Sequence, residues 1–225
     1  MKSTIVLAIA LFFFSGVSGQ DTGTVDSSFA NSHYRHRLAF FKQMPDGKKE
    51  IVFLGNSITE GGEWQELSGR KNVINRGISG DVTYGVLARL DEVLSSKPQR
   101  IFLLIGINDM KRGIPPDTIA KTYARIVETI RRISPKTKLF LQSVLPVNES
   151  MLGAPYKKLT NESIRRLNVH IRSIAASSGT TYVDLHPVLA DEKGALKSEY
   201  TQDGIHLWPD AYIHWVELLR GKKLL

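Results

Sequence analysis

The chain contains no cysteine among its 225 residues. This absence excludes disulfide bonds, thiolate metal sites and a cysteine nucleophile. It also excludes a lipid anchor on a cysteine at a signal-cleavage site. The fold must therefore depend on its core, and a chain of this length can bury a substantial core within one domain.

Long runs of like charge are also missing. Lys and Arg number 30 against 22 Asp and Glu, which gives a net charge of +8, but no block reaches five like charges. The basic pairs are short and scattered, and no nucleic-acid-binding motif is present. We therefore predict a basic, solvated surface and no nucleic-acid partner, with an acidic substrate or an anionic surface left open.

Apolar runs long enough to cross a bilayer are absent as well. Ile5–Phe14 has ten apolar residues, which is too short for a comfortable membrane span. It follows Lys2 and precedes the small residues 15–19, a pattern typical of a secretory signal peptide. We expect a signal peptide over 1–19, a leader and helix over 20–48, and one folded domain over 49–225. An uncleaved anchor is the alternative; cleavage would export the protein to a periplasm or the extracellular space, with no membrane span.

Buried strands alternate with helical patterns along the rest of the chain. The expected strands are 51–54, 71–75, 101–105, 138–144 and 180–185, separated by amphipathic segments. Continuous apolar strands suit a parallel sheet that is covered on both faces. The pattern predicts an α/β fold, a three-layer α/β/α sandwich with a five-stranded parallel sheet, joined by right-handed crossovers. The order of the strands cannot be read from it.

Polar, glycine-rich segments follow the first three strands. They are Asn56-Ser57, residues 78–81 and Asn108-Asp109. All three should lie at one edge, because the carboxyl ends of parallel strands share an edge. Ser57 suits a nucleophile there, or simply the N-cap of the next helix.

A fourth polar segment, Asp203-Gly204-Ile205-His206, precedes the last expected helix. A Ser, a His and an Asp are the groups that nucleophilic acyl transfer needs: the imidazole deprotonates the hydroxyl and the carboxylate orients the imidazole. The spacing lets Asp203 reach His206. The alternative is an ordinary turn with a capping or packing histidine.

These four ordered blocks resemble those of the SGNH, or GDSL-type, esterase/lipase superfamily. Residues 55–59 resemble its first block, with Asn56 in place of the Asp of the family name, and 77–81, 106–109 and 203–206 resemble the others. The likeness covers 50–219 and is strongest to the branch with platelet-activating-factor acetylhydrolase subunits and bacterial sugar O-acetylesterases. A flavodoxin-like sandwich is the implied fold.

The resemblance implies roles for individual residues. Ser57 would be the nucleophile, His206 the base and Asp203 its partner. The backbone N–H groups of Ser57 and Gly80 and the Asn108 amide would form the oxyanion hole, without cofactor or metal. The α/β-hydrolase alternative is disfavoured because Thr59 stands where its Gly-x-Ser-x-Gly elbow needs the second glycine.

Further residues could contact the substrate because they follow catalytic segments or lie in a loop at the same edge. They are Trp64, Met110, Lys111, Asn148 and Trp208. Packing or a solvated turn is the alternative for each of them. His33, His36, His170 and His214 fall on expected helices without a partner, and no cluster has the spacing of zinc ligands.

The sequence thus predicts a secreted serine esterase that hydrolyses a small-molecule or glycan ester. The favoured substrate is a carbohydrate O-acetyl ester, such as a sialate or polysaccharide acetyl ester. Alternatives are a lysophospholipase or thioesterase of the same family, an acyltransferase, and a non-catalytic carbohydrate-binding protein on the same fold.

Overall fold

A computed structural model gives the structure of residues 27–225. The predicted signal peptide over 1–19 and the first part of the leader lie outside the described residues. Within the described part, no helix is long and apolar enough to cross a membrane.

The five strands form one parallel sheet, which confirms the predicted fold class. They are β1 (Ile51–Gly55), β2 (Val73–Gly77), β3 (Arg100–Leu104), β4 (Lys138–Gln142) and β5 (Thr181–Val183). Their order in the sheet is β2-β1-β3-β4-β5. The chain leaves β1 in one direction to form β2 and returns on the other side to form β3. Such a reversal opens a crevice at the carboxyl ends of β1 and β3, where ligands bind in sheets of this kind.

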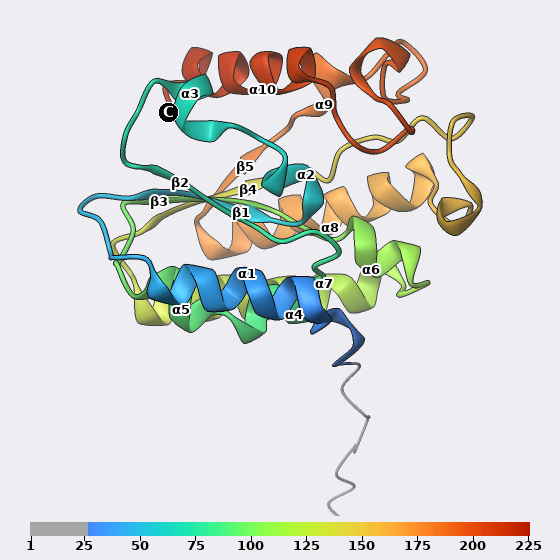
Figure 1. The fold of residues 1–225 in the computed structure, drawn as a ribbon. Coiled ribbons are helices and arrows are strands. Elements are labelled where there is room, and N and C mark those ends of the chain that lie inside the picture. Colours follow the sequence, from blue (N-terminus) through green and yellow to red (C-terminus); the bar gives the residue numbers. More distant parts are fainter. Residues whose placement is uncertain (1–26) are drawn as a thin grey trace, which may run out of the picture.

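Helices cover both faces of the sheet and produce the predicted three layers (Figure 1). One layer contains α3 (Trp64–Ser68), α9 (His186–Leu189) and α10 (Pro209–Gly221). The other contains α1 (Ser32–Gln43), α4 (Thr83–Ala88), α5 (Leu90–Leu94), α7 (Pro116–Ile133) and α8 (Asn161–Ser178). The short helices α2 (Ser57–Glu60) and α6 (Ile107–Lys111) follow β1 and β3, and the 3-10 turns are η1 (Ser27–Phe29), η2 (Ala154–Tyr156) and η3 (Ser198–Tyr200).

A ladder of aromatic rings joins the sheet to the layer of α3 and α10. Phe53, Phe102 and Phe140 are in register on adjacent strands, and their rings stack 4.9 and 4.7 Å apart. Trp64 lies parallel to Phe53 at 3.9 Å and packs edge-on against Trp215. Trp64 is only 2% exposed. Its interpretation as a substrate contact is therefore wrong: the indole packs α3 onto the sheet.

The helical segment that follows β2 is divided in two. The chain forms α4 and α5 with Arg89 between them, and Asp81 is not the N-cap, which is Val82. Asp81 instead forms a fully buried ion pair with Arg89 at 2.9 Å. The Arg89 guanidinium also donates to the backbone carbonyls of Gly55 and Arg76. This arginine thus ties the ends of β1 and β2 to the loop that follows β2.

Candidate active site

Ser57 stands at the carboxyl end of β1 as the first residue of α2. The preceding side chain caps the helix: Asn56 Oδ1 accepts a hydrogen bond from the Ile58 backbone N–H at 3.0 Å. Because Asn56 fills this role, the hydroxyl of Ser57 is not needed as a cap. Ser57 Oγ lies 3.0 Å from His206 Nε2, within hydrogen-bond distance.

The loop before α10 holds His206 in place. Asp203 Oδ1 accepts from the backbone N–H groups of Ile205 and His206 at 3.0 and 2.8 Å, and Asp203 Oδ2 lies 2.6 Å from His206 Nδ1. Gly204 adopts φ +89°, and a Cβ there would lie 2.6 Å from the Asn148 carbonyl, so the tight turn requires glycine. The turn therefore places the carboxylate on the imidazole nitrogen that faces away from Ser57.

The carboxyl group of Asp203 is stabilised in its ionised form. Partial burial favours the neutral acid, but the hydrogen bonds from the side chain and backbone of His206 outweigh it and keep the pKa of Asp203 below its ordinary value. A carboxylate in this position fixes the imidazole tautomer with a proton on Nδ1, which leaves Nε2 as the acceptor for the Ser57 hydroxyl.

Three residues that line the space beside Ser57 carry hydrogen-bond donors. Within residues 27–225, no group accepts a hydrogen bond from the backbone N–H of Ser57 or of Gly80. Gly80 has φ +81°, a conformation that other residues rarely adopt. Asn108 Nδ2 donates one hydrogen to the Asp81 carbonyl at 3.0 Å, which orients the amide and leaves its second hydrogen. The three donors can stabilise negative charge on a substrate oxygen.

Two buried carboxylates support these donors from below. Asp81 pairs with Arg89, and Asp109 accepts hydrogen bonds from the backbone N–H and hydroxyl of Thr83. Burial raises the pKa of Asp81 to about 6, with Arg89 acting in the opposite direction. Burial likewise raises the pKa of Asp109 to about 6. Both side chains are fully buried and neither residue lines the space beside Ser57, so they hold the segments that carry the donors without contacting a substrate.

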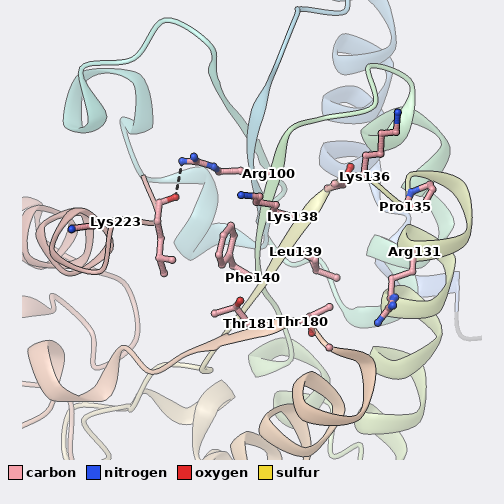
Figure 2. A pocket seen from close by; sticks show the side chains of 13 residues that line it. Arg100, Arg131, Pro135, Lys136, Lys138, Leu139, Phe140, Thr180, Thr181 and Lys223 are labelled. Carbon is pink, nitrogen blue, oxygen red and sulfur yellow. Dashed lines mark hydrogen bonds between the residues drawn. The ribbon is translucent and has the colours of Figure 1, made fainter.

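A small hollow of about 160 Å³ lies over these groups. It is lined by Ser57, Ser79, Gly80, Ile107, Asn108, Lys111, Tyr156, Ile205 and His206. A larger hollow, of about 510 Å³, lies at the opposite edge, where β3 and β4 begin (Figure 2). It contains Arg100, Lys138 and Phe140 but none of the four sequence blocks, so the smaller hollow is the candidate active site.

Of the five predicted substrate contacts, only Lys111 lines this hollow. Met110 is 5% exposed and belongs to the core, like Trp64. Asn148 Nδ2 donates to the Leu196 carbonyl, and its backbone N–H donates to the Gly204 carbonyl, so Asn148 supports the histidine loop. Trp208 is 47% exposed at the start of α10, outside the hollow. The other four predicted contacts, Trp64, Met110, Asn148 and Trp208, therefore do not line the hollow.

The sequence patterns missed two residues around the site. Tyr156, from η2, lines the hollow, and nothing in its local sequence distinguishes it from other loop tyrosines. Glu60, at the end of α2, accepts hydrogen bonds from the backbone N–H and hydroxyl of Ser79, next to Gly80. The only available signal for Glu60 was its position three residues after Ser57.

Three of the four histidines that we expected to lack a partner have a carboxylate neighbour. His33 contacts Glu60, His170 contacts Asp117 and His214 contacts Glu217. The first two pairs join different helices, and the third lies within α10. None of these residues lines the hollow. Among residues 27–225, no group of three or more His, Asp and Glu side chains is arranged to hold a metal ion.

Comparison with known proteins assigns this chain to a family. The model of the GDSL-like Lipase/Acylhydrolase family matches residues 53–212. Platelet-activating factor acetylhydrolase IB subunit alpha1 from Bos taurus is 24% identical over 189 residues, which cover 81% of this chain and 76% of that protein.

Solved structures agree with this match. A GDSL-like lipase from Bacteroides thetaiotaomicron superimposes with a TM-score of 0.73 and 27% identity, covering 88% of this chain and all of that one. A variant of an acetyl-xylooligosaccharide esterase from Geobacillus shares the fold, with a TM-score of 0.62 and 19% identity over 79% of this chain and 95% of that one. The resemblance read from the four sequence blocks is confirmed: the chain belongs to the GDSL-like lipase/acylhydrolase family of serine hydrolases that act on ester bonds.

Proposed function

We propose that Ser57, His206 and Asp203 form the catalytic triad of this esterase. The observation that carries the proposal is the continuous line of contacts from Asp203 Oδ2 to His206 Nδ1 at 2.6 Å and from His206 Nε2 to Ser57 Oγ at 3.0 Å. The backbone N–H groups of Ser57 and Gly80 and the Asn108 amide form the oxyanion hole.

The reaction proceeds through an acyl-enzyme. His206 Nε2 takes the Ser57 proton as Oγ bonds to the ester carbonyl carbon, and the carbonyl oxygen becomes an oxyanion held by the three donors. The alcohol leaves with the proton from Nε2. Water then gives a proton to Nε2 and attacks the acyl carbon, and Ser57 regains its proton as the acid departs.

We infer a small acyl group, an acetyl ester on a carbohydrate, as the substrate. A hollow of about 160 Å³ supports a short acyl chain over a long one. Two similar proteins are named an acetylhydrolase and an acetyl-xylooligosaccharide esterase. These names favour an acetyl group as the acyl part of the substrate and a sugar as its alcohol part. The apolar segment at residues 5–14 supports export to where polysaccharides occur.

The test compares the chain from residue 20 onwards with its Ser57→Ala variant on p-nitrophenyl acetate and on O-acetylated oligosaccharides. We expect acetate release from both substrates, and a loss of about a thousandfold or more in the variant. Equal rates in the two proteins would overturn the triad and favour a carbohydrate-binding protein without turnover.

The acyl chain and the acceptor decide between the remaining alternatives. Faster turnover of long-chain lysophospholipids or thioesters than of acetyl esters would refute the acetyl assignment while leaving the triad in place. Acetylated sugar products that form only when an acceptor sugar is present would identify an acyltransferase.

A further inference from the structure

The hollow over Ser57 has a distinct electrostatic character. Of its nine lining residues, only Lys111 carries a permanent charge, and none is an Asp or Glu. Asp203 lies behind the imidazole of His206 and is not part of the lining. The residues that line the hollow therefore carry one positive charge and no carboxylate.

The ammonium group of Lys111 is not neutralised within the described part of the chain. It forms no ion pair and no hydrogen bond there, and Nζ lies 4.1 Å from the centre of the Tyr156 ring. A cation over an aromatic face is oriented but keeps its full charge. The neighbouring Arg112 does not line the hollow, and its Nη1 donates a hydrogen bond to Ser28 Oγ at 2.6 Å.

The position of Lys111 along the chain places it beside the reacting atoms. It follows Asn108 by three residues on the short helix α6, and residues with this spacing are neighbours on a helical surface. Tyr156 comes from η2 and also lines the hollow, and its ring contact with Nζ restricts where the flexible lysine side chain can lie. A substrate whose carbonyl oxygen contacts Asn108 would thus carry its neighbouring groups past Lys111.

We propose that Lys111 and Tyr156 form an anion subsite, and that the natural ester carries a negatively charged group, such as a sugar carboxylate, close to the acetylated hydroxyl. This inference rests on the proposed function and names the class of its substrate. A charge-assisted hydrogen bond to Lys111 selects the acidic substrate. The same charge repels an ester that bears a quaternary ammonium group.

The first test uses two small aryl acetates of similar shape, 4-acetoxybenzoate and 4-acetoxybenzamide. Acetate release gives kcat/KM for each with the wild type, Lys111→Met and Lys111→Arg. The anionic-to-neutral ratio should fall about tenfold in Lys111→Met, since the charge-assisted bond is lost, and should stay near the wild-type value in Lys111→Arg. Comparing ratios between proteins cancels the different reactivities of the two esters.

A charge-matched control separates the subsite from the overall field of a basic protein. Lys136→Met removes one charge in the hollow at the opposite sheet edge (Figure 2) and should leave the ratio unchanged. An equal fall in Lys136→Met, or no fall in Lys111→Met, would overturn the proposal.

A second test uses O-acetylated glucuronic acid and O-acetylated glucose. Preference for the acidic sugar that is lost in Lys111→Met would support both proposals. If the aryl pair responds to Lys111 while neither sugar ester is hydrolysed, the anion subsite stands and the carbohydrate assignment fails. If both sugars react equally and the substitution changes nothing, the carbohydrate assignment stands and the subsite fails.

Discussion

At the scale of single residues, the site depends on neighbouring side chains having separate tasks. Asn56 caps α2, and Ser57 contacts His206 instead. In the same way, Asn108 uses one amide hydrogen to hold the Asp81 carbonyl, and the other is the one that we propose binds the oxyanion. Each proposed catalytic group is therefore oriented by a partner that does not react.

Replacing Asn108 with Ala should lower kcat about a hundredfold with little change in KM, because its amide would bind the oxyanion more strongly than the ground-state carbonyl. Steady-state kinetics on p-nitrophenyl acetate measure both constants. Asn72→Ala is a suitable control, since the Asn72 amide also donates to a backbone carbonyl, that of Lys49, before β2. A fall of less than threefold for Asn108→Ala would remove this amide from the oxyanion hole.

At the scale of elements, α1 contributes to the site although it precedes the matched residues 53–212. His33 and Arg37 on α1 both contact the carboxylate of Glu60, each at 3.2 Å. Glu60 in turn binds the Ser79 backbone N–H and hydroxyl at 2.5 and 2.6 Å. Helix α1 therefore supports the turn that presents Gly80.

We expect Glu60→Gln to lower kcat about tenfold, because the neutral amide accepts the two Ser79 hydrogen bonds more weakly and the Gly80 N–H is held less firmly. KM should change less than kcat, since a positioning defect acts on the transition state. Binding of a boronic-acid inhibitor that mimics the oxyanion should weaken in parallel with kcat. Parallel changes in KM and an unchanged inhibitor affinity would indicate a general loss of structure instead.

At the scale of the whole molecule, the same cluster makes stability depend on pH. Burial favours the neutral acid, but hydrogen bonds from Ser79 and His33, together with Arg37, keep the pKa of Glu60 below its usual value of 4.5. A carboxyl group with a lower pKa in the folded state stabilises that state above the unfolded pKa. The contribution is lost as the pH falls below 4.5 through the folded pKa.

The wild type should thus exceed Glu60→Gln in free energy of unfolding at pH 7, and the gap should narrow below pH 4.5. Urea denaturation at pH 7 and at pH 4 or lower measures it. The raised pKa values of Asp81 and Asp109 affect both proteins alike and cancel in the difference. A gap that is independent of pH would mean that the Glu60 charge is not responsible for it.

Local sequence pattern was sufficient to predict the fold class and to find the four sequence blocks. A strand buried on both faces must be apolar at every position, as Ile51–Gly55 is, so alternating strands and helices can be read without knowing their neighbours. The order Ser57, Asp203, His206 was likewise visible because nucleophilic chemistry restricts the residue types. Sequence therefore determined the architecture and the residues proposed for catalysis.

Only the tertiary structure decided how distant elements meet. The strand order depends on how the crossover connections run. The other contacts join segments that are separated in the chain: Arg89 binds Gly55 and Arg76, Trp64 packs on Phe53, and Tyr156 contacts Lys111. Periodicity reports whether a side chain is buried, but the neighbour that buries it depends on how the layers pack. The lining of the hollow, on which the proposed substrate class rests, is therefore a property of the folded chain.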